Sequence, residues 1–296
     1  MKLLVVCNPH AAHGRASRQV EALRSLLSDQ HAGSTFVETM GPGHARRLVA
    51  EADLSQFEGV VAAGGDGTVF EVLNGLYAHS QDRRCPLGII PLGTGNAFAR
   101  EFGLQPTDWA PAVGRLSEGT VRRVDVGRVE CADGDFHFLN IIGLGLAVDA
   151  GRSAGRLKFA GRSAYAFGAL WQILKLQSLP LVMELDGEFV RQDNVFVEIS
   201  NSRYTGTSFL IAPKARLDDG LLDVTWLRRL PRWRLLWLFR TIFSGRHTAY
   251  PEVGSRQARE IVLHAPAGQL LMPDGEFQGR TPARIRCLHQ DLELFC

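Results

Sequence analysis

Two glycine-rich segments contain the residue types that could hold a phosphate group. The first is Gly-Gly-Asp-Gly-Thr at residues 64–68, and the second is Pro-Leu-Gly-Thr-Gly-Asn at residues 91–96. Each follows a short apolar run and precedes a stretch with helical periodicity. Glycines let the backbone approach an anion, and the N–H groups and dipole of a helix N-terminus favour negative charge. The pair therefore predicts a binding site for a nucleotide polyphosphate with its metal.

A single glycine-rich turn of this kind also occurs between a strand and a helix without any ligand. Phosphoryl transfer needs a phosphate cradle, a metal and a residue that positions the acceptor hydroxyl. Asp66 could serve the metal or the hydroxyl, and Thr68 and Thr94 could each donate to a phosphate. Asn96 could simply cap the helix that follows it. Two such segments in one region favour the functional interpretation.

The composition limits the class of protein. The chain has 296 residues, 45% of them hydrophobic, and a net charge of +2. These values predict about two globular domains and give no sign of nucleic-acid binding. The 5 cysteines are widely spaced without a CxxC pair, so we expect a reducing cytosol rather than a disulfide framework or zinc site. Because no apolar run approaches the roughly 20 residues of a membrane span, we expect a cytoplasmic protein, with peripheral contact at the inner membrane face as a further option.

Residues 1–122 alternate strand and helix signals. The expected strands cover residues 2–7, 34–39, 60–63 and 87–90. The expected helices cover residues 15–28, 43–52, 69–76 and 97–102. Repeated βα units predict an α/β domain with a parallel sheet and helices on both faces. Ligands bind such sheets at the carboxyl ends of the strands. Four polar residues fall there: Asn8, Thr39, Asp66 and Thr94.

Residues 123–296 have a different pattern, with short strands separated by Gly, Asp, Asn and Pro turns. The expected strands cover residues 124–129, 136–142, 181–185, 194–200, 222–227, 260–264 and 283–287. This spacing is typical of a mostly antiparallel β-sandwich or barrel. Helical stretches at residues 163–179 and 232–243 interrupt it. We expect this second domain to end with residues that could pack back on the first.

Two acidic turns in the second region could carry chemistry. Asp274-Gly275-Glu276 offers two carboxylates, either of which could accept the proton of an attacking hydroxyl. The same three residues also suit a plain hairpin turn. Residues 212–223 place three acids around one glycine turn. That turn suits a hard cation such as Mg²⁺ or Ca²⁺, or is a solvated acidic loop.

Residues 224–251 are rich in arginine and aromatic side chains and contain no Asp or Glu. The arginines are Arg228, Arg229, Arg232, Arg234, Arg240 and Arg246, and the aromatic residues include Trp226, Trp233, Trp237, Phe239 and Phe243. Such a stretch can lie in the headgroup region of an anionic membrane. The alternative is a helix with a basic edge that packs on the β-rich domain.

Together these motifs resemble the diacylglycerol kinase catalytic-domain family, which includes sphingosine and ceramide kinases. The fuller resemblance is to the bacterial soluble lipid kinases, and it covers essentially the whole chain. The matching features, in chain order, are Asn8-Pro9, Thr39, both glycine segments, residues 212–223 and the Asp-Gly-Glu turn. The resemblance implies an ATP-binding α/β domain followed by a β-sandwich domain, with the active site in the cleft between them.

The resemblance also implies roles for individual residues. The residues expected to line ATP are Asn8, Pro9, His10, Ala11, Ala12, Thr39, Gly64, Gly65, Asp66, Gly67, Thr68, Val69, Phe70 and Thr94, with Asn96 beside them. Proton acceptance falls to the Asp-Gly-Glu turn, so Glu276 is the favoured base and Asp274 the alternative. A structural Mg²⁺ is implied at three positions: Arg216, Asp219 and Leu221. Arg216 could contribute only its carbonyl oxygen.

We therefore expect an ATP- and Mg²⁺-dependent lipid kinase that transfers the γ-phosphate to a lipid hydroxyl, positioned near Asp66. Diacylglycerol, a sphingoid base, phosphatidylglycerol and an isoprenoid alcohol are all possible acceptors. An NAD kinase would share the first glycine segment, but residues 91–96 and the aromatic surface argue against it. A non-catalytic lipid-binding regulator is the other alternative. The presence of Asp66, Asp274 and Glu276 argues against that reading.

Overall fold

A computed structural model describes residues 1–296 apart from 15, 80–83, 106–107, 157–177, 207 and 265. The described residues form two compact units, Met1–Val124 with Gln290–Cys296, and Asp125–His289. Strands β5 (Val121–Cys131) and β16 (Ala283–Phe295) each carry the chain from one unit into the other. The helix expected over 163–179 lies outside the described residues, except for residues 178 and 179.

The first unit is built on a parallel sheet. Its strands are β1 (Leu3–Cys7), β2 (Thr35–Glu38), β3 (Gly59–Gly64) and β4 (Leu87–Pro91), which lie in the order β4-β3-β1-β2. The C-terminal end of β16 joins this sheet, since Leu294 of β16 pairs in parallel with Leu87 of β4. The α/β prediction for this region is thereby confirmed.

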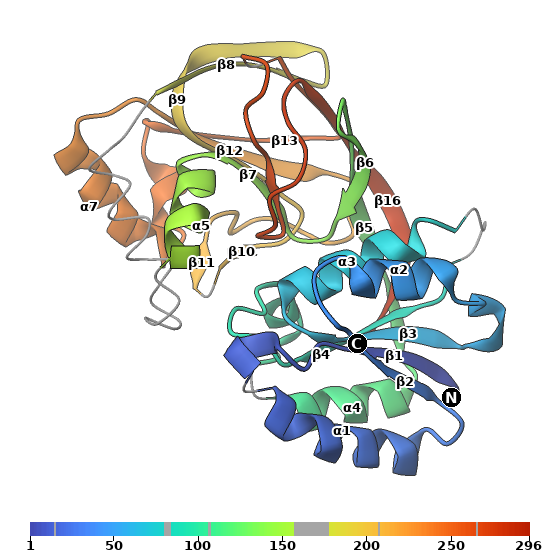
Figure 1. Ribbon diagram of the computed structural model, residues 1–296. Coiled ribbons are helices and arrows are strands. Elements are labelled where there is room, and N and C mark those ends of the chain that lie inside the picture. The colour runs from blue at the N-terminus through green and yellow to red at the C-terminus, as the bar shows by residue number, and fades with distance from the viewer. Residues whose placement is uncertain (15, 80–83, 106–107, 157–177, 207, 265) are drawn as a thin grey trace. The chain divides into compact units, whose positions relative to one another are not determined.

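Helices cover both faces of this sheet (Figure 1). They are α1 (Ser17–Gln30), α2 (His44–Glu51), α3 (Asp66–Leu76) and α4 (Trp109–Glu118), with short 3-10 helices at Ala11–Gly14, Leu54–Gln56 and Phe98–Phe102. One face packs on α1 and α4, where Leu23 and Leu116 are almost fully buried against the strands. The sequence pattern predicted α1, α2 and α3 but not α4.

The second unit is mostly antiparallel β-sheet. Its main strand order is β13-β12-β9-β8-β14-β16, while β7 pairs with β9 and β15, and β6 pairs with β5. The strands are β6 (Gly134–Phe138), β7 (Ile141–Gly145), β8 (Leu179–Leu185), β9 (Glu188–Ser200), β10 (Tyr204–Thr205), β11 (Phe209–Leu210), β12 (Leu222–Arg228), β13 (Val253–Ala258), β14 (Glu260–Leu263) and β15 (Met272–Pro273). The helices in the described part of this unit are α5 (Leu146–Arg156) and α7 (Arg232–Ile242), with a short 3-10 helix at Arg246–Ala249.

The single strand expected over 136–142 is wrong. The structure divides it into β6, which ends at Phe138, and β7, which begins at Ile141. The backbone N–H groups of Leu139 and Asn140 donate to the carboxylate of Asp274 instead of to a neighbouring strand. Because a strand needs its N–H groups for the ladder, this carboxylate interrupts it.

Two helical glycines in the first unit have opposite surroundings. A Cβ atom added to Gly75 of α3 would lie 2.7 Å from the Arg46 carbonyl oxygen and 2.7 Å from Val49 Cβ, both on α2. A Cβ added to Gly114 of α4 would have no atom within 4 Å. Gly75 therefore permits the close packing of α2 on α3. Gly114 serves no such packing and lowers the stability of α4, because glycine loses more backbone conformational entropy on folding than alanine does.

We predict that the same substitution has opposite effects at these two sites. Gly114→Ala should raise the free energy of unfolding by roughly 0.5–1 kcal/mol, because alanine has the higher helix propensity. Gly75→Ala should lower it by about 1–3 kcal/mol, because α2 must move away. Urea unfolding of both variants checks this. A Gly75→Ala protein as stable as the wild type would contradict the packing argument.

Candidate functional site

The two glycine-rich segments lie against each other at the carboxyl ends of β3 and β4. These strands are neighbours, with Gly64 opposite Pro91. The backbone N–H groups of Leu92 and Gly93 both donate to the Gly64 carbonyl oxygen, at 2.9 and 3.1 Å. A Cβ atom on Gly93 would overlap the Cα of Gly65, so only glycine permits this approach. The two segments therefore form one backbone cradle.

Asp66 joins the two halves of this cradle. It begins α3, and its carboxylate accepts the N–H groups of Ala97 at 3.1 Å and Phe98 at 3.4 Å. These donors open the 3-10 helix at Phe98–Phe102, so Asp66 caps a helix that belongs to the other glycine segment. Burial raises the pKa of Asp66, and the hydrogen bonds from backbone N–H groups oppose that rise.

Asn96 does not cap this helix as we expected. Its side-chain amide donates to the Gly93 carbonyl oxygen at 2.8 Å, and its φ angle of 49° places it in the left-handed region. Asn96 thus closes the second glycine segment on itself. The cap comes from Asp66, which lies 30 residues earlier in the chain, and no local pattern around the helix could reveal it.

The loop after β1 contacts the same cradle through Asn8. The Asn8 side-chain amide donates to Thr68 Oγ1 at 3.2 Å, and its carbonyl oxygen accepts the N–H of His10 at 3.0 Å. The Asn8 backbone N–H donates to the Ala63 carbonyl oxygen at 2.9 Å, which fixes the end of β1 beside the end of β3. A Cβ atom on Gly64 would overlap the Thr68 side chain. The structure therefore brings Asn8, Thr68 and the first glycine segment together.

The remaining residues expected to line ATP differ in their placement. Thr39 follows β2, and its N–H donates to the Cys7 carbonyl oxygen at 2.8 Å, so it lies at the same edge of the sheet. The loop after it is held by Glu71 of α3, whose carboxylate accepts the N–H of Gly43 at 2.7 Å. Val69 and Phe70, by contrast, are only 4% and 5% exposed. Their side chains belong to the core, so only their backbone could meet a ligand.

In the second unit, Asp274 and Glu276 occupy a tight turn after β15 but face different surroundings. Asp274 and Gly275 both have positive φ angles, 48° and 89°, and the Glu276 N–H donates to the Pro273 carbonyl oxygen at 2.7 Å. This is the signature of a type I′ turn. Asp274 is 6% exposed, whereas Glu276 is exposed to solvent.

The Asp274 carboxylate is a structural anchor. It accepts the backbone N–H groups of Leu139 at 3.0 Å, Asn140 at 2.9 Å and Ile141 at 2.9 Å. Nearby, the Asn201 side-chain amide donates to the Leu139 carbonyl oxygen at 2.8 Å. Asn140 and Asn201 were not predictable from the sequence, because the residues that meet here lie 62 and 134 positions apart and come together only through the antiparallel fold.

The acidic turn at residues 218–220 is organised by buried hydrogen bonds. Asp125 is fully buried, and its carboxylate accepts the Gly220 N–H at 2.7 Å and lies 3.0 Å from His289 Nδ1. Asp219 Oδ1 accepts the Leu221 N–H at 3.1 Å. Within the residues that the structure describes, no three His, Cys, Asp or Glu side chains are grouped to hold a metal. A structural Mg²⁺ here would depend largely on backbone carbonyl oxygens.

The Arg216 side chain forms an ion pair rather than facing a metal position. Its guanidinium lies 3.3 Å from the Asp218 carboxylate, and both residues belong to the same loop. Only the main chain at position 216 is therefore open to a metal role, as the sequence indicated.

Helix α7 presents a basic and aromatic surface. Trp233 is 70% exposed and Trp237 is 42% exposed, whereas Leu235 and Leu238 on the opposite side are each 2% exposed. Arg234 forms an ion pair with Glu252 at 2.8 Å. Among the residues described, the other arginines of this region form no ion pair: Arg228, Arg229, Arg232, Arg240 and Arg246. Among the helices described, none is both long and apolar enough to cross a membrane.

Two protein-family models match this chain, one over each of its two regions. Residues 2–129 match the Diacylglycerol kinase catalytic domain, and residues 140–296 match the YegS C-terminal NAD kinase beta sandwich-like domain. The second match confirms the β-sandwich expected for the second region.

Individual relatives agree with these matches. A diacylglycerol kinase of Mycobacterium tuberculosis is 33% identical, covering 99% of this chain and 94% of its own length. A diacylglycerol kinase of Bacillus subtilis is 28% identical, covering 98% of this chain and 94% of its own. A crystal structure of a candidate diacylglycerol kinase from Bacillus anthracis matches 99% of this chain and 96% of its own, with a TM-score of 0.81 and 25% identity.

An NAD kinase from Archaeoglobus fulgidus, solved in complex with ATP, has a TM-score of 0.50 and 16% identity over 100% of this chain and 94% of its own. That similarity concerns the fold alone. The resemblance carried by the glycine segments is confirmed by the relatives and the domain matches, and this chain belongs to the bacterial diacylglycerol kinase family.

Proposed function

We propose that this protein transfers the γ-phosphate of ATP to the hydroxyl group of a lipid. The observation that carries the proposal is the single cradle formed by the two glycine segments at the carboxyl edge of the parallel sheet. Helix α3 begins there at Asp66, so the positive end of its dipole favours a phosphate in the cradle. Membership of the diacylglycerol kinase family supports a lipid acceptor.

The chain's own carboxylates divide into two roles in this proposal. Asp66 lies between the two glycine segments of the cradle and is the candidate to hold Mg²⁺ there. When bound, this ion would neutralise charge on the transferred group. Exposed Glu276 is the candidate base that accepts the proton of the lipid hydroxyl. The lipid oxygen forms a bond to the γ-phosphorus as the bond to the β-phosphate oxygen breaks, and ADP leaves.

We predict that labelled γ-phosphate moves from ATP to at least one lipid alcohol in mixed micelles with Mg²⁺. Asp66→Asn should lower the rate by roughly 100-fold, the scale expected when one preorganised electrostatic contact is lost. Asp53→Asn is the matched control, because Asp53 caps another short 3-10 helix of the same unit. Phosphorylation of NAD instead of lipid, or of neither, would contradict the proposal.

The two acids of the type I′ turn should respond differently to amidation. Glu276→Gln should lower kcat by about 100-fold, the usual contribution of a general base, and leave the melting temperature unchanged. Asp274→Asn should lower the free energy of unfolding by roughly 2 kcal/mol or more, because a carboxylate that accepts three buried N–H groups is lost. Thermal melting and steady-state kinetics of both variants test this. A stable but inactive Asp274→Asn protein would make Asp274 the base.

Helix α7 supports a further part of the proposal, peripheral binding to an anionic membrane. Its exposed tryptophans would enter the headgroup region, and the neighbouring arginines would attract acidic lipids. A lipid kinase needs such contact because its acceptor resides in the bilayer.

We predict that Trp233→Ser weakens binding to phosphatidylglycerol vesicles by about tenfold, since a large apolar side chain no longer enters the interface. Phe189→Ser is the control, because Phe189 is 53% exposed but stacks on His264, the residue after β14, and is not part of α7. Vesicle co-sedimentation at low and high salt measures both variants. Equal losses in the two variants, or equal binding of the wild type to uncharged phosphatidylcholine vesicles, would argue against this surface.

A further inference from the structure

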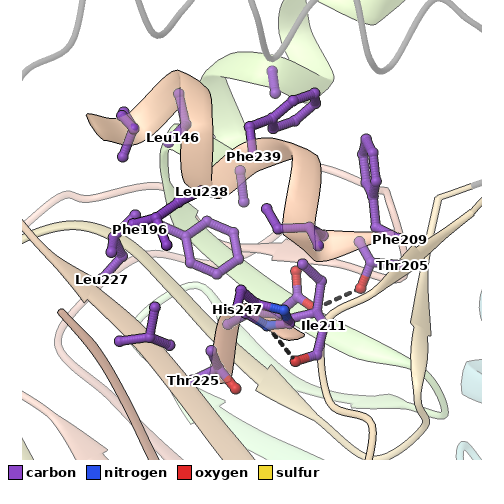
Figure 2. A pocket seen from close by; sticks show the side chains of 16 residues that line it. Leu146, Phe196, Thr205, Phe209, Ile211, Thr225, Leu227, Leu238, Phe239 and His247 are labelled. Atoms are coloured by element: carbon purple, nitrogen blue, oxygen red, sulfur yellow. Dashed lines mark hydrogen bonds between the residues drawn. The ribbon is translucent and has the colours of Figure 1, made fainter. Parts of the chain in front are cut away.

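The second unit contains an apolar cavity on the buried side of α7 (Figure 2). Side chains from α5, α7, β9 and β12 form most of its wall, among them Phe196, Leu238 and Phe239. The cavity belongs wholly to this unit and shares no residue with the glycine cradle or with the Asp-Gly-Glu turn. Its lining would suit an aliphatic chain.

Besides Thr205, three polar side chains interrupt this apolar wall: Glu198, Thr225 and His247. They are 0%, 2% and 4% exposed. In Figure 2, Thr225 and His247 are both drawn below Phe196 and Leu238. Three buried polar groups gathered in one apolar cavity form a polar floor and call for an explanation.

Each of the three has a polar atom without a hydrogen-bond partner in the described part of the chain: Glu198 Oε2, Thr225 Oγ1 and His247 Nδ1. The other Glu198 oxygen accepts the hydroxyl groups of Thr205 and Ser200. His247 Nε2 lies 2.9 Å from the Ile211 carbonyl oxygen, which can only accept, so Nε2 carries the proton. His247 Nδ1 of the neutral ring is therefore an acceptor.

The unpaired atoms of Glu198, Thr225 and His247 determine which chemical group could bind to them. Burial raises the pKa of Glu198 to about 7 and lowers the pKa of His247, which favours the neutral imidazole. The His247 Nδ1 atom accepts, and the Thr225 hydroxyl can donate or accept. Glu198 Oε2 accepts when the carboxyl is ionised and donates when it is protonated, so the polar floor needs a partner that can both donate and accept. A hydroxyl group does both without bringing the charge that an apolar cavity disfavours.

We propose that this cavity binds a hydroxyl-bearing aliphatic chain, with the hydroxyl group donating to the acceptors of the polar floor formed by Glu198, Thr225 and His247. The inference rests on the proposed lipid kinase function for its biological purpose, and it narrows the lipids offered to the enzyme to those with such a chain. The binding itself requires neither ATP nor turnover.

The first test compares two probes of equal size on the wild-type protein, octan-1-ol and 1-methoxyheptane. Both have the same number of heavy atoms, but the ether has no hydroxyl hydrogen. Calorimetric titration without ATP should show that octanol binds at least roughly tenfold more tightly, because the ether leaves the buried acceptors unpaired. Equal affinity, or no octanol binding up to its solubility limit, would overturn the proposal.

The second test uses variants that keep the shape of the floor. Thr225→Val and Glu198→Gln should each lower octanol affinity toward that of the ether and leave ether binding unchanged. Thr248→Val is the matched control, because the Thr248 hydroxyl donates to the Gly245 carbonyl oxygen and lies outside the cavity lining. Unchanged octanol binding in both floor variants, or equal losses of octanol and ether, would overturn the assignment.

Failure of the proposed hydroxyl site and failure of the proposed kinase function give different results. A protein that prefers octanol but phosphorylates no lipid keeps this site and loses the proposed kinase function. A protein that phosphorylates a lipid but does not distinguish octanol from the ether keeps the kinase function and loses this site.

Discussion

The close approach of two backbones, at Gly65 and Gly93, is the constraint on which the first unit depends. No side chain fits between them, so the two strand-to-helix connections must meet without one. The Asp66 carboxylate then ties the start of α3 to the start of the helix at Phe98–Phe102. A carboxylate held by backbone donors has a fixed direction, which is what a phosphate site needs from its surroundings. Any chemistry assigned to Asp66 therefore acts together with its role as a helix cap.

In the second unit, the Asp274 carboxylate is also held by backbone N–H donors, whereas the Glu198 carboxylate is not. Asp274 accepts three backbone N–H groups, and this separates β6 from β7 along the chain. Glu198 is equally buried, but only one of its oxygens has donors. A buried carboxylate with satisfied oxygens stabilises a turn, whereas one with a spare oxygen destabilises its surroundings until a donor arrives. Asp274 therefore anchors a turn, whereas Glu198 is suited to bind a ligand.

The extent to which the sequence predicted the fold depended on the range of the interactions. Strands β1, β3 and β4 of the first unit were predictable because each is a short apolar run before a glycine or polar turn. Helix α4 was missed, although its buried residues Ala112, Val113 and Leu116 have helical spacing. The division of residues 136–142 was not predictable, since the acid responsible lies more than 130 positions away. The same reason hides the polar floor: its three members lie on β9, β12 and the segment after α7, and no motif connects them.

Helix α7 connects the two lipid-related features of the second unit. Its inner side contributes Leu235 and Leu238 to the cavity wall, and its outer side exposes Trp233 and Trp237. A helix that is apolar on both sides is usually buried on both sides, in a core or against a membrane. Of the residues that the structure describes, those that pack on α7 cover its inner side, and the arginines around the outer side suit an anionic surface rather than another apolar domain. In the proposed function, α7 would therefore contact the membrane on its outer side and the bound aliphatic chain on its inner side.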